Sequence, residues 1–383
     1  MRVFVIAGEA SGDKLGAALM AGLRQLRPDV TFDGVGGPLM QVEGLVSRFD
    51  MNELSVMGLA EILPKYRALK ARIRQMADAV VETQPDLLIT IDSPDFCLRV
   101  ARLVKAASVI RTVHYVAPTV WAWRPGRAAK MAHHIDHVLA LFPFEPPFME
   151  AAGMDCDFVG HPVVAEPVAT LADAAALGVG TVVLVLPGSR KGEVSRLADR
   201  FGAALALIAA TVPDARFVIP TTGGVHALVQ ERVQQWAVPV TVLAPGSPDK
   251  AAWFKRADVA LAASGTVSLE LAANGTPMVI AYDMAWLSRI IISRMLKVDT
   301  VTLVNLVSET RVVPEFIGKN CDAGPIAQAV LAVLDNPKAQ QAAMDVTMER
   351  LGLGGEAPGL RAARAVLARF EQASVKHDKP NGQ

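Results

Sequence analysis

Short runs of consecutive apolar residues alternate along the chain with longer segments of helical periodicity. Such runs occur at residues 1–7, 31–35, 87–91, 111–116 and 138–142, and again at 181–186, 216–220, 240–243 and 259–263. Runs of this length, bounded by glycine, proline or polar residues, are typical of strands buried in a parallel sheet. Between them, segments such as 14–26 and 197–210 carry apolar residues at helical spacing. The alternation predicts an α/β protein whose strands are joined by helices.

This alternation is interrupted near the middle of the chain. Residues 166–180 lose strand character and are rich in alanine, glycine and proline, which is typical of a linker. At 383 residues, the chain also exceeds the length that one hydrophobic core usually supports. We therefore expect domains at 1–165 and 181–345, helices at 346–372 that pack back on the N-terminal domain, and a disordered polar tail at 373–383.

The strand predicted at 259–263 runs into Ser264, Gly265 and Thr266, and a helical pattern follows. Gly265 lets the backbone approach a ligand, Ser264 or Thr266 can cap the helix, and the first N–H groups of the helix favour an anion. Glu270 stands one helical turn after Thr266, where its carboxylate can accept hydrogen bonds from both hydroxyls of a ribose. These features indicate a nucleotide site. An ordinary capped turn with a solvated glutamate is the alternative.

A similar turn follows the strand predicted at 181–186, with Gly188, Ser189, Arg190 and Lys191 in succession. Gly188 and Ser189 provide close backbone approach and a helix cap, and the next two residues put two cations at the start of a helix. A diphosphate fits this arrangement. Surface charges that merely follow a turn are the alternative.

Polar residues also follow the first strand, in the loop GEASGD at 8–13. This loop is not a GxGxxG dinucleotide motif, and its two carboxylates would repel a pyrophosphate. We expect Glu9, Ser11 and Asp13 to face sugar hydroxyls instead. A tight turn with Asp13 in the first turn of the following helix is the alternative.

Asp92 ends the strand at 87–91, and ligands of open α/β sheets bind at such strand ends. A partly desolvated carboxylate there is a candidate general base, whereas Asp95 is expected to cap the next helix. His114 lies on the strand at 111–116 and is either a core residue or part of the site. Trp121 and Trp123, beside an arginine, can form an apolar platform for a sugar or an acyl chain.

The segment 53–76 combines apolar and basic side chains around Pro64, which is expected to break the helix. Such a segment can sink apolar side chains into a lipid surface while its cations meet phosphates. A core helix with a solvated basic face is the alternative. The candidate membrane-contact residues are Val56, Met57, Leu59, Ile62, Leu63, Lys65, Arg67 and Arg72.

Composition narrows the class of protein. The chain is 52% hydrophobic and 20% charged, with a mean hydropathy of +0.33, which is apolar for a soluble protein. No run approaches the ~18 apolar residues of a spanning helix, and Met1 leads into a strand with no signal peptide, so we expect a cytoplasmic protein. Lys and Arg total 38, as do Asp and Glu, so no net charge recruits nucleic acid. The three cysteines lie far apart and are interpreted as reduced, with no metal site.

Eight motifs, taken in order, resemble the lipid-A-disaccharide synthase family. They are GEASGD at 8–13, VMGLAEIL at 56–63, TIDSPDF at 90–96, HYVAPTVWAWR at 114–124, FPFE at 142–145, FVGHP at 158–162, LPGSR at 186–190 and ASGTVSLE at 263–270. The resemblance implies a GT-B glycosyltransferase with two Rossmann-like domains facing across a cleft. It also implies transfer of sugar from UDP-2,3-diacylglucosamine to 2,3-diacylglucosamine 1-phosphate without a cofactor, by a peripheral protein at the cytoplasmic face of the inner membrane.

The implied reaction assigns roles to the candidate residues. A β linkage made from an α-linked UDP sugar requires one inverting displacement and one base, for which Asp92 is the candidate and Asp95 or His114 the alternatives. No DxD pair is placed to hold a metal on the diphosphate, and Asn305, expected after a strand, would lie on the phosphate or uracil side. Because both substrates are acylated, the resemblance favours membrane contact by the segment at 56–74.

Two other functions fit parts of the sequence. A UDP-sugar 2-epimerase would share the fold and the UDP site, and a two-lobed sugar-binding protein would share the architecture without catalysis. The apolar composition and the C-terminal helix, which follows a break at 352–355, favour self-association as a homodimer.

Overall fold

The computed structural model describes residues 1–54, 59–121, 126–283 and 298–377, without the side chains of 59–66 and 374–377. The chain divides into two compact units. Unit 1 comprises Met1–Pro162 together with Gly354–Gln383, and unit 2 comprises Val163–Leu353. The chain therefore leaves unit 1 once and returns to it after unit 2 is complete.

Unit 1 is built on a six-stranded sheet in which every pair of neighbours is parallel. Its strands are β1 (Arg2–Ala7), β2 (Thr31–Val35), β3 (Leu87–Ile91), β4 (Arg111–Tyr115), β5 (His137–Ala140) and β6 (Asp155–Phe158). Their order across the sheet is β2-β1-β3-β4-β5-β6, so the direction of winding reverses between β1 and β3. Ligands of such doubly wound sheets bind where the order reverses. We call this position the unit 1 switch point.

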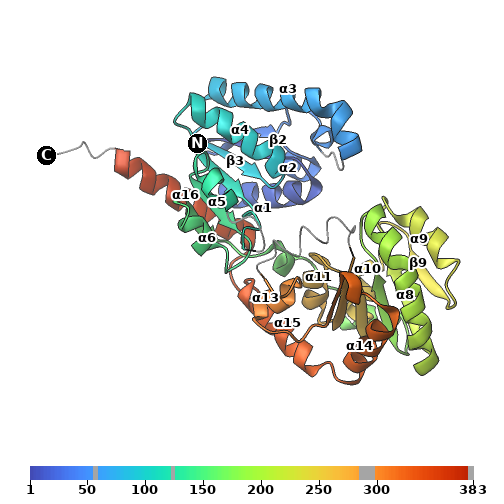
Figure 1. The fold of residues 1–383 in the computed structure, drawn as a ribbon. Helices are drawn as coiled ribbons and strands as arrows, with labels where there is room; N and C mark the ends of the chain where they lie inside the picture. Colours follow the sequence, from blue (N-terminus) through green and yellow to red (C-terminus); the bar gives the residue numbers. More distant parts are fainter. Residues whose placement is uncertain (55–58, 122–125, 284–297, 378–383) are drawn as a thin grey trace. The chain divides into compact units, whose positions relative to one another are not determined.

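Helices connect the strands of unit 1 (Figure 1). They are α1 (Ala10–Leu26), α2 (Pro38–Val42), the 3₁₀ turn η1 (Met51–Glu53), α3 (Leu59–Thr83), α4 (Pro94–Ala107), α5 (Gly126–Ala132), α6 (Pro146–Glu150) and α16 (Pro358–His377). The expected break at Pro64 is wrong, because α3 runs through this residue.

The last helix belongs to unit 1 and lies side by side with α1 (Figure 1). A Cβ on Gly22 of α1 would lie 2.8 Å from the carbonyl oxygen of Gly359, and a Cβ on Gly359 would lie 2.6 Å from that of Ala18. The two helices therefore approach too closely for any larger residue. Arg369 of α16 also pairs with Asp157 of β6 at 2.9 Å. Residues 373–377, which were expected to begin a disordered tail, belong to α16 instead.

Unit 2 repeats the architecture with a second all-parallel, six-stranded sheet. Its strands are β7 (Val182–Leu186), β8 (Arg216–Pro220), β9 (Val240–Leu243), β10 (Val259–Ala263), β11 (Met278–Tyr282) and β12 (Glu315–Ile317). The order is β12-β11-β10-β7-β8-β9, with the reversal between β7 and β10, which we call the unit 2 switch point. The prediction of two Rossmann-like domains is confirmed for each unit.

The helices of unit 2 correct two expectations from the sequence. They are η2 (Pro162–Ala165), α7 (Leu171–Ala176), α8 (Lys191–Thr211), α9 (His226–Val233), α10 (Lys250–Arg256), α11 (Val267–Asn274), α13 (Leu303–Ser308), η3 (Gly318–Asn320), α14 (Ala323–Asp335) and α15 (Lys338–Arg350). The segment 166–180, expected to be a linker, contains a helix, because Thr170 and Asp173 form a capping box that starts α7. Asn305 lies within α13, and the described residues 298–302 that precede this helix form no strand.

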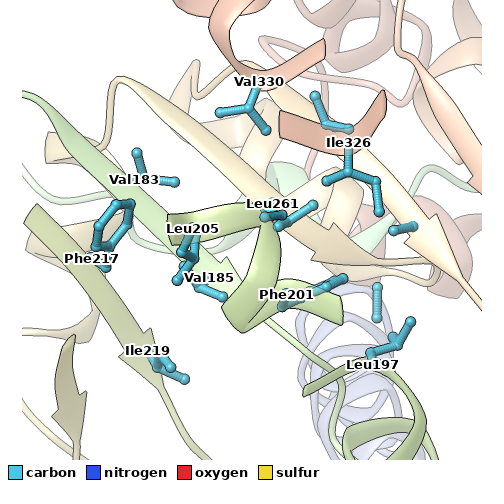
Figure 2. Packing of buried hydrophobic residues seen from close by; sticks show 14 of the residues in the cluster. Val183, Val185, Leu197, Phe201, Leu205, Phe217, Ile219, Leu261, Ile326 and Val330 are labelled. Carbon is cyan, nitrogen blue, oxygen red and sulfur yellow. The ribbon is translucent and has the colours of Figure 1, made fainter. Parts of the chain in front are cut away.

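The core of unit 2 shows why these runs form strands. Residues two apart on β7, Val183 and Val185, point to the same side of the sheet and meet Leu197, Phe201 and Leu205 of α8 (Figure 2). The alternate residues of β7 are also buried, on the opposite side. A strand covered on both sides must be apolar throughout, which explains the uninterrupted runs in the sequence.

Candidate active site

A cavity of about 410 Å³ lies at the unit 2 switch point, formed by the loops that follow β7, β8 and β10. This volume is within the range of small-molecule sites. Residues predicted from the sequence make up much of its lining, namely Gly188, Ser189, Arg190, Ser264, Gly265, Thr266 and Glu270. The two predicted turns therefore belong to one site.

The turn between β7 and α8 is organised by a carboxylate that the sequence analysis did not single out. One oxygen of Glu193 accepts the N–H groups of Ser189 at 3.2 Å and Arg190 at 3.3 Å, and the other accepts the Arg190 guanidinium at 3.0 Å. Gly188 has φ +116°, and a Cβ there would lie 2.6 Å from Glu193. The turn is thus fixed by Glu193, and two of its N–H groups are already engaged.

The turn between β10 and α11 is more open to a ligand. Gly265 has φ +156°, and a Cβ placed on it would meet no atom of the described residues within 4 Å. Thr266 occupies the N-cap position, yet in the described structure neither it nor Ser264 caps the helix, and the Ser268 hydroxyl instead donates to the Gly265 carbonyl at 2.9 Å. The N–H groups of Ser268 and Leu269 donate to the carbonyls of Gly265 and Thr266 at 3.3 and 2.9 Å. Among the described residues, the N–H groups of Thr266 and Val267 are therefore the donors of this turn that can bind an anion.

Lys250 is a second cation of the cavity that the sequence did not reveal. Its ammonium group lies 3.4 Å from the Glu270 carboxylate and 5.1 Å from the centre of the Phe254 ring. No local motif marks this lysine, because it reaches the site from the start of α10. Thr221 and Thr222, which also line the cavity, could have been found, since they follow a predicted strand.

Two predicted nucleotide-site residues lie elsewhere. The described residues that line the cavity do not include Lys191, an exposed residue at the start of α8, or Asn305. Asn305 is 1% exposed, and its side chain donates to the Val313 carbonyl and accepts the Val313 N–H group, both at 3.0 Å. Its amide therefore holds the segment that precedes β12.

At the unit 1 switch point, Asp92 follows β3 in an unusual backbone conformation. Asp92 and Ser93 have φ values of +50° and +41°, and the Ser11 hydroxyl, from the start of α1, donates to Asp92 at 3.4 Å. Two successive left-handed residues that are not glycine cost energy and are concentrated at functional sites. A Cβ on Gly8 would lie 2.6 Å from the Ser93 hydroxyl, so this position needs glycine. The half-buried Asp92 side chain thus lies where loops from β1 and β3 meet.

The other acidic candidates near this point have different surroundings. Asp13 is buried, and its carboxylate accepts the N–H groups of Gly37, Leu39 and Met40 at 2.9 to 3.0 Å, which fixes the start of α2. This matches the structural alternative for Asp13 more closely than contact with a sugar. Glu9 is half-buried immediately before α1, and Asp95 is exposed in the first turn of α4.

His114 is buried on β4 and is held in one tautomer. The Thr90 hydroxyl donates to the Val113 carbonyl at 3.1 Å and lies 2.8 Å from Nδ1 of His114. Because this hydroxyl has a single proton, Nδ1 must be the donor in their contact. Burial lowers the pKa of His114 to about 3, so the ring is neutral near pH 7.

The candidate sugar platform is described in part. Trp121 is half-buried and packs edge-on against Phe144, with ring centres 5.1 Å apart. Its indole N–H donates to Glu145 at 3.4 Å. Glu145 is 2% exposed, and burial raises its pKa to about 7. The sequence analysis quoted this glutamate only within a motif, and Trp123 lies outside the described residues.

The candidate membrane segment is also described in part. Val56 and Met57 lie outside the described residues, and the side chains of Leu59, Ile62, Leu63 and Lys65 are likewise not described. Arg67 is exposed. Arg72 pairs with Glu53 at 2.8 Å and stacks on the Phe49 ring at 4.4 Å, so it stabilises unit 1.

The described residues contain neither a candidate membrane span nor a candidate metal site. No described helix combines the length and the apolar character that a membrane span requires. No group of three or more His, Cys, Asp or Glu among the described residues is arranged to hold a metal ion.

Comparisons with known proteins agree with the resemblance seen in the sequence. The model of the lipid-A-disaccharide synthetase family matches residues 3–367. The lipid-A-disaccharide synthase of Ruegeria pomeroyi is 64% identical over 383 residues, which covers 97% of this chain and 96% of the relative. That of Rhodospirillum centenum is 47% identical over 377 residues, with 95% and 94% covered.

Solved structures show the fold. A UDP-GlcNAc 2-epimerase from Neisseria meningitidis bound to UDP-GlcNAc has a TM-score of 0.60 at 12% identity, with 97% of this chain and 100% of that chain covered. MurG from Acinetobacter baumannii has a TM-score of 0.51 at 14% identity, with 97% and 99% covered. The epimerase alternative is not favoured, because the close relatives are synthases. On the family match over nearly its whole length, the chain belongs to the lipid-A-disaccharide synthase family.

Proposed function

We propose that this protein joins UDP-2,3-diacylglucosamine to 2,3-diacylglucosamine 1-phosphate, giving a β-1,6-linked disaccharide phosphate and UDP. Membership of the family supports glycosyl transfer in lipid A biosynthesis. The observation that carries the proposal is the cavity at the unit 2 switch point, which combines a helix N-terminus, two cations and two carboxylates. The UDP-GlcNAc bound to the Neisseria epimerase supports a sugar nucleotide in a fold of this kind.

In the donor site, charge must be stabilised on the leaving group. As the bond between the anomeric carbon and the diphosphate breaks, negative charge grows on UDP. The first N–H groups of α11, the Arg190 guanidinium and the Lys250 ammonium supply positive charge for that purpose. Glu270 accepts hydrogen bonds from the ribose hydroxyls, and its ion pair with Lys250 orients it.

In the acceptor site, Asp92 serves as the general base. The acceptor 6-hydroxyl oxygen attacks the anomeric carbon from the side opposite UDP, and its proton passes to the Asp92 carboxylate. One displacement converts an α-linked donor into a β-linked product. The left-handed backbone at Asp92 and the hydrogen bond from Ser11 orient the carboxylate. The proposal requires the sugar held by unit 2 to reach this hydroxyl during turnover.

The experiment that tests this function measures UDP release in detergent micelles with each substrate alone and with both together. We expect UDP only when both are present, together with a disaccharide phosphate identified by mass spectrometry. Turnover of the donor alone would favour an epimerase or a hydrolase. Binding of both substrates without turnover would favour a non-catalytic sugar-binding protein.

We also propose that the protein acts in the cytoplasm as a peripheral protein on the inner membrane. Both proposed substrates carry acyl chains and reside in lipid. On α3, Arg67, Lys70 and Arg74 are exposed and can meet lipid phosphates.

Vesicle sedimentation tests the membrane proposal. With vesicles of phosphatidylcholine and phosphatidylglycerol, reversing the charge at Arg67 and Lys70 should lower the partition coefficient by about tenfold or more, because each cation near an anionic surface contributes about 1 kcal/mol. Lys338→Glu, at the exposed start of α15 in unit 2, is the control. Equal binding by the α3 variant and the control would refute a role for α3.

A further inference from the structure

Glu145 is a buried acid that the proposed mechanism does not use. It lies between β5 and α6, is 2% exposed, and occupies the N-cap position of α6. One of its oxygens accepts the N–H groups of Leu141 at 3.1 Å and Phe142 at 3.0 Å. The other accepts the indole N–H of Trp121 at 3.4 Å. A single carboxylate therefore connects the loop after β4 to the loop after β5.

The aromatic rings around Glu145 form a continuous group, which we call the aromatic wall. Trp121 meets Phe144 edge-on, and Phe144 stacks on Phe142 with ring centres 5.4 Å apart and planes 6° apart. Phe142 in turn lies 5.4 Å from the His161 ring. Phe142 is buried, whereas Trp121 and Phe144 are half-buried, so part of the wall faces solvent.

The wall lies at the same edge of the unit 1 sheet as Asp92. Trp121 follows β4 and Phe144 follows β5, while Asp92 follows β3, and these three strands are parallel neighbours. One face of Phe144 is covered by Phe142, and Trp121 and Phe144 meet edge to face. Because the polar end of the indole is held by Glu145, the half-buried remainder of these two rings is apolar surface.

We propose that Glu145 is a positioning residue that orients Trp121, so that Trp121 and Phe144 bind the acylated sugar of the acceptor. The identity of the ligand rests on the proposed function. The orientation of the wall does not, because it follows from hydrogen bonds within unit 1. Glu145 acts through Trp121 and takes no part in proton transfer.

The hydrogen bonds of Glu145 are consistent with this role, because its side chain is the acceptor in all three. A carboxylate accepts hydrogen bonds through both oxygens, whereas a glutamine has one acceptor oxygen and a donating amide. If the glutamine oxygen accepts the two backbone N–H groups, its NH₂ group faces the indole N–H. Glu145→Gln therefore keeps the shape and the turn but removes the bond to Trp121.

A double-mutant cycle tests the proposal. Trp121→Phe removes the indole N–H and keeps an aromatic ring, so it should act through the same contact as Glu145→Gln. We expect each variant to raise the KM for the acceptor about fivefold to tenfold with little change in kcat, and the double variant to be no worse than either. UDP affinity should not change. Glu150→Gln, an exposed residue of α6, is the control.

Effects on KM that multiply in the double variant, or no effect of Glu145→Gln in a folded protein, would overturn the proposal. If the wild-type protein shows no transferase activity, the proposed function fails, and direct binding of 2,3-diacylglucosamine 1-phosphate in micelles then decides the role of Glu145. Equal binding by the wild-type protein and Glu145→Gln would overturn the proposal in that case as well.

Discussion

The two switch points have the same topology and opposite chemistry. In each unit the site lies between the first strand of the sheet and the strand next to it on the side where winding reverses. In unit 2 the loops there carry Gly188, Arg190 and Gly265 and lead into the N-terminus of α11, and Lys250 reaches the site from α10. In unit 1 the loops carry two carboxylates, those of Glu9 and Asp92. The backbone there has positive φ at Asp92 and Ser93, neither of which is glycine. The fold determines where a ligand binds, and the loop residues determine whether the site suits an anion or a hydroxyl group.

The strongest test of this difference removes the charge that defines the unit 1 site. Asp92→Asn should lower turnover by about 10²-fold to 10⁴-fold, which is the usual contribution of a general base, because the amide cannot take a proton. UDP affinity, measured by calorimetry, should be unchanged, since UDP is assigned to unit 2. Unchanged turnover would remove Asp92 from the mechanism and leave Asp95 and His114 to be tested.

The buried acid of unit 1 predicts an unusual dependence of stability on pH. Burial raises the folded pKa of Glu145 to about 7, above the unfolded value of 4.5, so the folded chain retains the proton over this interval. The proton retained on Glu145 stabilises the folded chain fully below about pH 4.5, and this stabilisation is lost as the pH rises through about 7. Between these two pH values the free energy of unfolding falls by about 3 kcal/mol, at 1.36 kcal/mol for each pH unit.

Chemical denaturation of the wild-type protein and Glu145→Gln between pH 5 and 8 measures this contribution. The free energy of unfolding of unit 1 should fall with rising pH in the wild-type protein, and this component should be absent from the variant. Parallel pH profiles for the two proteins would contradict the prediction. Above about pH 7 unit 1 would keep a costly buried charge at Glu145, as expected for a residue retained for function.

Neighbouring cations offer a sharper test of the unit 2 site. Arg190 lines the cavity and Lys191 does not, although they are adjacent and both exposed. Arg190→Ala should weaken UDP binding by about 10-fold to 100-fold, which corresponds to one charge-assisted hydrogen bond, while Lys191→Ala should have little effect. Titration calorimetry with UDP measures both. Equal losses would mean that only the total positive charge matters.

The smallest effect is expected at Asp13, and it distinguishes an acid that holds the backbone of unit 1 from an acid that binds a ligand. Asn at position 13 can still accept the N–H groups of Gly37 and Met40 through one oxygen but loses the bond from Leu39. Asp13→Asn should therefore destabilise unit 1 by about 1 to 2 kcal/mol. At temperatures where the Asp13→Asn variant is folded, its KM for the acceptor should remain unchanged. A raised KM without destabilisation would instead support contact with the sugar.

Much of the fold could be predicted because its strands are buried on both sides and are therefore apolar throughout. The cavity of unit 2 could also be anticipated in part, since Gly188 and Gly265 stand at strand ends where the backbone can approach a ligand closely. Lys250, Glu193 and Glu145 could not be predicted in this way, because tertiary contacts give them their roles. The contact of the Asn305 amide with the Val313 backbone could not be predicted for a related reason, since an asparagine in an apolar segment can bind backbone groups as well as a ligand.

The return of the chain to unit 1 at Gly354 affects the order of biosynthesis. The helix face around Gly22 is matched to Gly359, which leaves the ribosome only after all of unit 2. Until then the nascent N-terminal sheet exposes the small, apolar surface of α1 that α16 later covers. Unit 2 is continuous in sequence and can fold during that interval, so unit 2 can be complete before α16 packs on α1.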